Sequence, residues 1–378
     1  MKRFILILFC AVLTLPVSAS ADGPSPSLSA KSAVLYEVHG GRWVYERNAD
    51  VRLPMASTTK MMTALVALRL LSLDAVYTVP AEACGIEGSS LYLKAGDRIS
   101  ARDLMHALLL RSANDAASAL AILASGSESA FAEEMNAEAR RLGLQNTSFK
   151  NPHGLDTDGH YSSARDLALI LAAAMEDERF VEISGCERYT VEFEDRAQVL
   201  YNHNKLLYLT DYVVCGKTGY TQKSGRCLVT AAERDGVRLI AVTMNASDDW
   251  NDHVKLFECG FDQLEGLTVI SSADRFYADV AGGKIDKVLC RPTEEFFAVT
   301  AKNAVITCDT LLPSVLFAPI YEGEIVGMLR IYEDGKEIGE ICLAACEDIE
   351  YKEQGIPLIR RIFGAVSEKQ RNISKWKK

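Results

Sequence analysis

The first 264 residues carry strand-like patterns at both ends and helical patterns between them, and this order limits the folds open to the chain. Alternating apolar residues over 33–38 and 43–46 predict an opening hairpin. Apolar residues at helical spacing predict helices over 102–111, 115–124, 128–142 and 164–175. Strands are predicted again over 211–220, 226–233 and 237–244, before a last helix over 251–264. We therefore predict an α/β protein of the α+β kind, with an antiparallel sheet between helical layers.

The pattern changes after about residue 265. Short β-rich runs separated by turn residues occupy 275–280, 295–299, 305–308 and 324–332. Asp334 and Gly335 mark a further hairpin. The sequence therefore predicts two domains, over 22–264 and 265–355, of which the second is an all-β domain.

Both ends of the chain have the features of segments outside these domains. Lys2 and Arg3 precede an apolar run that ends at Leu15, and small residues follow up to Ala21. This order predicts a signal peptide over 1–21 that is cleaved after Ala21, and the alternative is an uncleaved membrane anchor. We therefore expect an exported protein that works at the extracytoplasmic face of the membrane, in the periplasm or in the cell wall.

The C-terminal segment 356–378 is basic and amphipathic. Its apolar residues share one helical face, whereas most of its seven Lys and Arg residues lie off that face. The pattern predicts a helix that lies on an anionic membrane surface, and the alternative is a solvated tail. The formal charge of the whole chain is −10. Without the signal peptide and the tail the balance is about −18, so the body of the protein is not expected to bind nucleic acid.

Cysteine usage does not indicate a metal site. Nine of the ten cysteines remain after the signal peptide, and no two have the CxxC spacing of a zinc site. We therefore expect neither a metal nor a cofactor. Cys215 and Cys227 lie on either side of the predicted turn between two strands, either as partners across the strands or, on the preferred interpretation, as free buried thiols.

The first of three motifs that indicate chemistry is Ser57-Thr58-Thr59-Lys60, at the start of a predicted helix over 58–71. A spacing of three places Ser57 and Lys60 on one helical face, where the lysine can serve as the base for the serine if burial lowers its pKa. The predicted helix has an apolar stripe of Met62, Leu65, Val66 and Leu70. Taken alone, the motif also fits a serine that only caps a helix.

The second and third motifs supply polar groups that a substrate would need. Ser112 and Asn114 flank Ala113 at a break between helices, where Ser112 would relay a proton and Asn114 would hold a substrate amide. Lys217 and Thr218 lie in a predicted strand, and they offer a cation and a hydroxyl to a carboxylate. Gly219 would let a ligand backbone approach that strand. The alternatives are a helix cap for the second motif and a protected edge strand for the third.

Together the three motifs form the active-site set of penicillin-recognising serine enzymes. Over roughly residues 30 to 355 the sequence resembles the low-molecular-weight penicillin-binding proteins that are serine-type D-alanyl-D-alanine carboxypeptidases. The stretches that carry the resemblance, besides the first motif, are EACGIEGSSLYL (82–93), SANDAASAL (112–120), NPHGLDTDGHY (151–161), NHNKLL (202–207) and GKTGYTQKSGRCLV (216–229).

The resemblance implies a β-lactamase/transpeptidase-like fold for residues 22–264 and a defined reaction. Ser57 would attack the bond between the last two D-alanines of a peptidoglycan peptide, and Lys60 would accept its proton. Ser112 and Lys217 would pass a proton to the leaving amine. The backbone N–H groups of Ser57 and Tyr220 would form the oxyanion hole, and β-lactams would acylate Ser57 as inhibitors.

Two positions depart from the family pattern. Ala113 stands where the family usually has glycine, and its methyl group is expected to crowd the loop and affect the rate. The family often has an arginine after the last strand of the sheet, but residues 248–253 contain none. Recognition of the substrate carboxylate is therefore expected to rest on Lys217 and Thr218.

Three other interpretations fit the sequence less well than the carboxypeptidase. A class A-like β-lactamase needs a deacylating glutamate, and Ala132 occupies the position where it would stand. A non-catalytic peptidoglycan-binding protein would have no chemical reason to retain Ser57 and Lys60 beside the other polar residues. His153 and His160 offer an alternative base or a metal pair, but a loop-packing role fits better, because His153 lies between Pro152 and Gly154.

Overall fold

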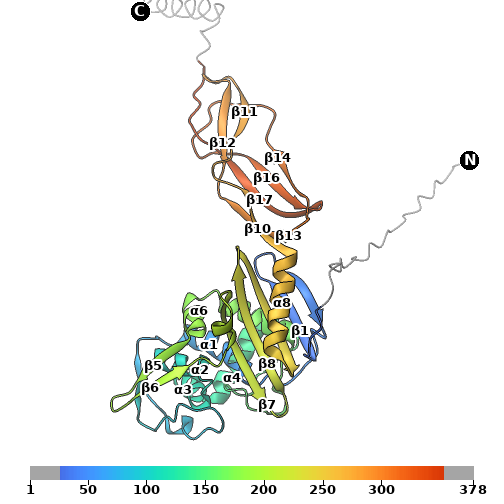
Figure 1. Ribbon diagram of the computed structural model, residues 1–378. Coiled ribbons are helices and arrows are strands. Elements are labelled where there is room, and N and C mark those ends of the chain that lie inside the picture. The colour runs from blue at the N-terminus through green and yellow to red at the C-terminus, as the bar shows by residue number, and fades with distance from the viewer. Residues whose placement is uncertain (1–25, 353–378) are drawn as a thin grey trace, which may run out of the picture. The chain divides into compact units, whose positions relative to one another are not determined.

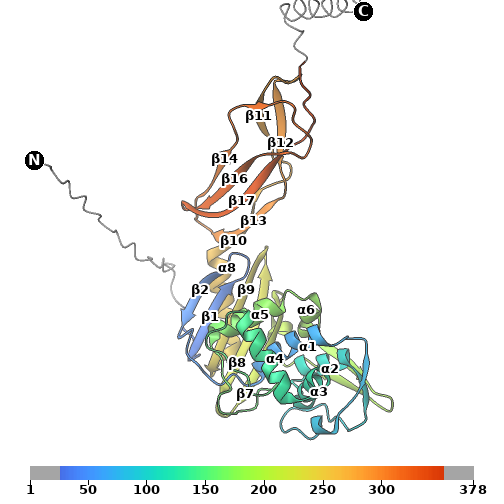
Figure 2. The same ribbon diagram turned by 180° about the vertical axis from the view of Figure 1, so that it is seen from behind.

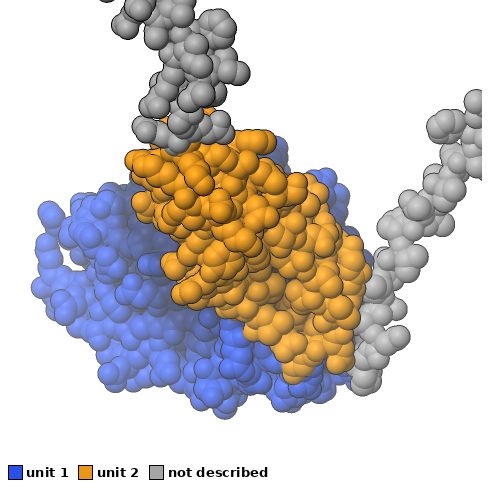
Figure 3. Space-filling view, turned by 90° about the horizontal axis from the view of Figure 1, so that it is seen from above, with its two compact units in different colours: residues 1–263 blue, residues 264–378 orange. Residues whose placement is uncertain are grey.

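The computed structural model of the protein describes residues 26–352 and divides into two compact units (Figure 3). These units are Met1–Gln263 and Leu264–Lys378. The predicted signal peptide and the basic tail lie outside the described residues. Within residues 26–352, no helix combines the length and the apolar character needed to cross a bilayer.

The first unit is built on a five-stranded antiparallel sheet. Its strands, in spatial order, are β2 (Arg42–Arg47), β1 (Ser32–Glu37), β9 (Val237–Ala246), β8 (Gly225–Arg234) and β7 (Val213–Thr221). Strands from the start of the sequence therefore pair with strands from the end of the unit. The pairing of β1 with β9 joins them, with Val34 opposite Val242.

Helices cover both faces of this sheet. Helix α8 (Asp249–Gln263) crosses the face seen in Figure 1, and α5 (Ala164–Ala174) covers the face seen in Figure 2. The predicted antiparallel sheet between helical layers is confirmed.

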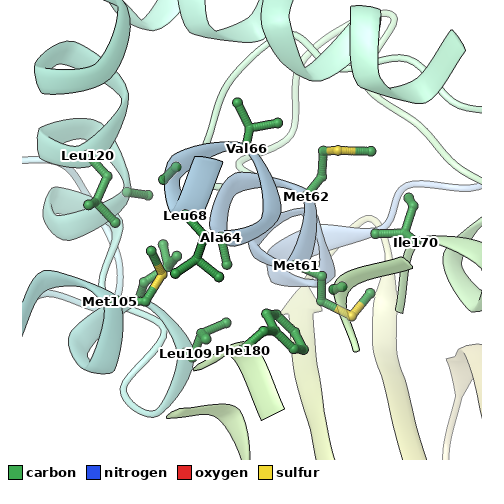
Figure 4. Close-up of a cluster of buried hydrophobic side chains, with 14 of the residues drawn as sticks. Met61, Met62, Ala64, Val66, Leu68, Met105, Leu109, Leu120, Ile170 and Phe180 are labelled. Atoms are coloured by element: carbon green, nitrogen blue, oxygen red, sulfur yellow. The ribbon is translucent and has the colours of Figure 1, made fainter. Parts of the chain in front are cut away.

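Helix α1 (Lys60–Leu70) lies at the centre of the helical layer, and Figure 4 shows apolar side chains from its neighbours around it. Those neighbours include α2 (Ala101–Leu109), α3 (Asn114–Ser125), α4 (Glu128–Arg141) and α6 (Glu178–Gly185). Of the predicted apolar stripe, Met62 and Val66 are buried, but the stripe does not describe the whole buried surface of α1. Leu70 is exposed, whereas Met61, Ala64 and Leu68 are buried as well, because helices contact α1 on several sides.

The predicted helices in this layer form because their first residues satisfy free backbone N–H groups. The side chains of Ser100, Ser127 and Ser163 accept N–H bonds at the starts of α2, α4 and α5. Gly126 ends α3 in the left-handed conformation, with φ 80°.

The elements that sequence patterns did not predict in this unit are short. They comprise α6 and the elements η1 (Ala56–Thr59), β3 (Val76–Thr78), η2 (Ala81–Ala83), β4 (Arg98–Ser100), β5 (Arg188–Glu192), β6 (Ala197–Tyr201) and α7 (Leu206–Leu209). Except for α6, each has five residues or fewer, too few to show a clear apolar period.

Strands are the only regular secondary structure among the described residues of the second unit, which confirms the predicted all-β domain. A six-stranded sheet has the order β14 (Ile306–Leu311), β16 (Ile325–Glu333), β17 (Lys336–Ala345), β12 (Lys287–Pro292), β11 (Phe276–Ala281) and β15 (Leu316–Phe317). Strands β10 (Leu264–Ile270) and β13 (Phe296–Ala301) form a separate pair. Leu329, Ile331 and Leu343 lie in the core of this unit.

Candidate active site

Ser57 lies in the short 3-10 helix η1, which leads directly into α1. Sequence analysis predicted one continuous helix from residue 58. Instead, Ala56 takes φ 48°, and the hydroxyl of Thr58 donates to the carbonyl of Met55 at 2.7 Å, which closes a tight turn before α1. The Ser57 hydroxyl makes no capping bond to η1 or α1, and its Oγ lies within hydrogen-bonding distance of Lys60 Nζ.

Lys60 is fully buried, and its amine is held by three oxygen atoms. Nζ lies 3.0 Å from Ser57 Oγ, 2.7 Å from Asn114 Oδ1 and 2.5 Å from the carbonyl oxygen of His153. Burial and the nearby charge of Lys217 hold the pKa of Lys60 well below its ordinary value. A neutral amine has two N–H donors, which the amide and the carbonyl can accept, so its lone pair faces the Ser57 hydroxyl.

The second motif lies beside this pair. Ser112 takes a left-handed conformation with φ 60°. Its buried Oγ has no hydrogen-bond partner among residues 26–352. Asn114 already binds within the chain, because Oδ1 accepts from Lys60 and Nδ2 donates to the Glu87 carbonyl at 2.6 Å. The motif therefore supplies one free hydroxyl and one amide that positions Lys60.

The methyl group of Ala113 does not crowd this loop. Its side chain is fully buried in the main apolar core, and its backbone has ordinary extended angles, φ −62° and ψ 124°. The methyl group lies in the core, and the effect on rate that was expected from replacing glycine here stays a prediction.

The third motif lies on β7, the edge strand of the sheet. Lys217 is 1% exposed and donates to the Thr218 carbonyl at 3.0 Å. Burial lowers its pKa from 10.5 to about 7. A Cβ atom at Gly219 would lie 3.1 Å from the Ser57 nitrogen and 3.0 Å from the Met55 oxygen. The glycine is thus needed for close packing against η1, whereas the sequence had suggested room for a ligand.

A cavity of about 580 Å³ brings the motifs together. Its lining residues come from η1, β7, β8, α8 and the loops between helices, and they are Ser57, Ser89, Ser112, His203, Thr218, Gly219, Tyr220, Arg226, Asp249 and Trp250. Lys60, Asn114 and Lys217 are not among the lining residues. Lys60 contacts the lining residue Ser57, and Asn114 contacts Lys60 in turn. Lys217 lies close enough to Lys60 to lower the pKa of its amine.

Arg226 is the main functional candidate that sequence analysis missed. It projects from β8 into the cavity, where its Nε lies 2.8 Å and its Nη2 lies 2.6 Å from Asp249 Oδ1. Its guanidinium carbon lies 5.5 Å from the centre of the Trp250 ring. Residues 248–253 contain no arginine, but β8 supplies one to the cavity. The register of the predicted hairpin could have indicated Arg226, because this residue pairs directly with Tyr220 across β7 and β8.

His153 and His160 support the loop that faces η1. Burial lowers the pKa of His153 to about 3 and that of His160 to about 4, so both are neutral at pH 7. His160 Nδ1 accepts the Lys150 N–H, and its Nε2 lies 2.9 Å from the Thr59 hydroxyl. These contacts favour loop packing over a base for Ser57.

Cys215 and Cys227 are both buried and free. The β7–β8 register places Cys215 opposite Ala231 and Cys227 opposite Gly219. They therefore do not face each other across the strands.

Comparison with known proteins places this site in a family. A profile described as "D-alanyl-D-alanine carboxypeptidase" matches residues 18–248, and one described as "Penicillin-binding protein 5, C-terminal domain" matches residues 268–351. The D-alanyl-D-alanine carboxypeptidase DacF of Bacillus subtilis is 33% identical over 96% of this chain and 98% of its own length. The D-alanyl-D-alanine carboxypeptidase DacC of Escherichia coli is 33% identical over 86% of this chain and 86% of its own length.

A solved structure agrees with these sequence matches. Penicillin-binding protein 5 from Haemophilus influenzae aligns with a TM-score of 0.68 at 29% identity, covering 87% of this chain and 99% of its own. From the length of these matches and the identity to the relatives, we conclude that this chain belongs to the D-alanyl-D-alanine carboxypeptidase family of serine peptidases.

Proposed function

We propose that this protein is a serine-type D-alanyl-D-alanine carboxypeptidase that removes the terminal D-alanine from peptidoglycan pentapeptides through an acyl-enzyme on Ser57. One observation carries the proposal. A fully buried amine, Lys60 Nζ, lies 3.0 Å from the hydroxyl oxygen of Ser57 at the edge of the cavity. The relatives that bear this enzyme name cover most of the chain.

The acylation step follows from this pair. Neutral Lys60 accepts the proton of the Ser57 hydroxyl while Oγ attacks the carbonyl carbon of the penultimate D-alanine. The carbonyl oxygen becomes an oxyanion between the backbone N–H groups of Ser57 and Tyr220. The close packing of Gly219 on η1 supports this assignment, since it holds β7 against the Ser57 nitrogen. Loss of one such donor typically costs about 3–4 kcal/mol of transition-state stabilisation.

Collapse of this intermediate breaks the carbon–nitrogen bond and releases D-alanine. The leaving amine takes up the proton that Lys60 accepted, relayed by the unpartnered hydroxyl of Ser112, and this returns Lys60 to its neutral form. Lys217, with its pKa lowered to about 7, can hold that proton near neutral pH. Water then attacks the Ser57 ester, and Lys60 takes the proton of the water. Cleavage of the ester restores the serine hydroxyl and frees the shortened peptide.

The terminal carboxylate of the substrate would bind Thr218 and Arg226. Asp249 accepts from Nε and Nη2 of Arg226, which fixes the guanidinium and leaves Nη1 for a ligand. A hydrogen bond to a charged group is worth about 1.5–3 kcal/mol. Arg226→Gln should therefore raise KM for the peptide by roughly 10- to 100-fold. Arg238→Gln, which breaks a similar surface pair with Glu233, is the control. Equal KM values for both variants would contradict the role of Arg226.

β-Lactams should acylate Ser57 and be released slowly. Fast release in class A β-lactamases requires a glutamate that activates water, and Ala132 stands at the corresponding position in α4. Its methyl group is buried and offers no base. The proposed activity toward β-lactams is therefore inhibition.

We also propose that the protein is exported, that residues 1–21 are the cleaved signal peptide, and that residues 356–378 bind an anionic membrane surface. The charge pattern of both segments supports this assignment, with about 1 kcal/mol expected per basic residue near such a surface. Deletion of residues 356–378 should move the protein from the membrane fraction to the soluble fraction. Equal partitioning of the two forms would contradict membrane binding by the tail. The acidic remainder of the chain is not proposed to bind nucleic acid.

The direct test of the activity uses a peptide that ends in D-Ala-D-Ala, with free D-alanine as the measured product. The parent should release D-alanine, and Ser57→Ala should release none. Ser272→Ala, a serine substitution in the second unit, should behave as the parent. Release by both the parent and Ser57→Ala, or by neither, would reject the proposal.

A further inference from the structure

Asp115 is a buried carboxylate that the proposed mechanism does not use. It follows Asn114 in the first turn of α3 and is 1% exposed. It forms no ion pair with any residue between 26 and 352, and five hydrogen bonds compensate its burial. The donors are Leu91 N–H twice, Leu93 N–H, Ser90 O–H and Ala116 N–H, at 2.6 to 3.1 Å. A buried charge needs such donors, and the start of α3 supplies a favourable dipole as well.

Four of these bonds fold the segment 89–93 around the carboxylate. The segment has no regular secondary structure, and Tyr92 takes φ 60°. Ser90 Oγ donates to Asp115 and accepts from the N–H of Tyr92 at 2.8 Å. Asp115 therefore supplies the acceptors that this irregular backbone would otherwise lack.

The same segment forms one wall of the active-site cavity. Ser89 lines the cavity, and its carbonyl accepts the backbone N–H of Asn114 at 2.7 Å. The Glu87 carbonyl accepts from Asn114 Nδ2, which orients Oδ1 toward Lys60. A displacement of this segment would thus move Ser89 and the amide that holds Lys60.

We propose that Asp115 is a positioning residue for acylation, which fixes the 89–93 wall and Asn114 and places a negative charge near the Lys60 amine. The inference rests on the proposed function of Ser57 and Lys60. It assigns no contact between Asp115 and substrate.

The charge of Asp115 gives a signature that a purely structural role would not. Among the groups around Lys60, Lys217 on β7 lowers the pKa of the amine, and Asp115 on α3 raises it. His153 and His160 face Lys60 from the loop before α5, and Cys84 faces Asp115 from the end of η2. A general base must be neutral, so acylation increases as pH rises through the pKa of the coupled lysines. This rise with pH is the acid limb of the rate profile, and loss of the negative charge should move it to lower pH.

The test measures acylation by a fluorescent penicillin between pH 5 and pH 9, as an observed rate. Asp115→Asn should slow acylation at least roughly 10-fold and shift the acid limb down by roughly 0.5–1 pH unit. Ser90→Ala keeps the charge, so it should slow acylation without shifting the limb. Asp166→Asn is the matched control, because Asp166 is also buried in the first turn of a helix and binds the Asn146 N–H and the Thr147 hydroxyl. It should lower stability and leave the acylation profile unchanged.

An unshifted limb in Asp115→Asn, or an equal shift in Asp166→Asn, would overturn the inference. If Asp115→Asn does not fold, a parent-like acylation rate in Ser90→Ala would overturn it. Failure of the proposed function is recognised separately. A parent that is acylated by penicillin but releases no D-alanine would reject the carboxypeptidase activity and still allow the role of Asp115 to be measured.

Discussion

Lys217→Met should stabilise the protein against unfolding, and this gain should be larger at pH 7 than at pH 9. Lys217 is 1% exposed, and burial lowers its pKa from 10.5 to about 7. Between these two values the unfolded chain holds more protons than the folded protein. The free energy of unfolding of the parent should therefore rise with pH in this window, by about 1.4 kcal/mol per pH unit at most from this one group.

The size of the effect follows from the same two pKa values. The ionisation of Lys217 should cost the parent about 4 kcal/mol of stability at pH 7 and about 2 kcal/mol at pH 9. Methionine does not ionise, so the difference between variant and parent should narrow by roughly 2–3 kcal/mol across this range. The variant should also lose D-alanine release.

Urea unfolding at pH 7 and pH 9, followed by tryptophan fluorescence, measures these free energies. Trp43 and Trp250, two of the three tryptophans, lie in the first unit and report on its unfolding. Lys217→Arg is the control, because a guanidinium stays charged over this range. It should remove the dependence of the free energy of unfolding on pH while keeping the cost of a buried charge. Parallel stability curves for the parent and Lys217→Met would refute the claim that Lys217 is buried with a lowered pKa.

Two further substitutions test the site geometry. Gly219→Ala should slow penicillin acylation at least roughly 10-fold, because its Cβ atom would press on the Ser57 nitrogen at 3.1 Å and disturb the oxyanion hole; an acylation rate equal to that of the parent would contradict this. Ser112→Ala should slow D-alanine release and change the free energy of unfolding by less than about 0.5 kcal/mol, because the Ser112 Oγ has no partner within residues 26–352; a large loss of stability in thermal melts would indicate a structural role instead.

The sequence was most informative where a local spacing determines the geometry. One helical turn separates Ser57 from Lys60, so their contact followed from the spacing of three alone. The layered fold was also predicted, because its long helices and strands have clear apolar periods. The stripe predicted for α1 was correct for Met62 and Val66 and wrong for Leu70, since a helix packed on several sides has no single apolar face.

Features that depend on pairing between distant segments could not be predicted in this way. Arg226 reaches the cavity because of the β7–β8 register, and Asp249 meets it from the start of α8. Asp115 meets the segment 89–93 only in the folded chain, where the backbone N–H groups of Leu91 and Leu93 donate to its carboxylate. Gly219 was expected to let a ligand backbone approach the strand, but the backbone that approaches it belongs to η1. Such contacts are set by tertiary packing, which apolar periodicity does not encode.

The central claim is that Ser57 and Lys60 form an acyl-transfer centre. Its most direct test is the mass of the protein after brief exposure to benzylpenicillin, followed by peptide mapping of the adduct. The account predicts one penicilloyl group per chain, attached to Ser57 and absent from both Ser57→Ala and Lys60→Met. An adduct on another residue, or full labelling of Lys60→Met at the parent rate, would contradict it.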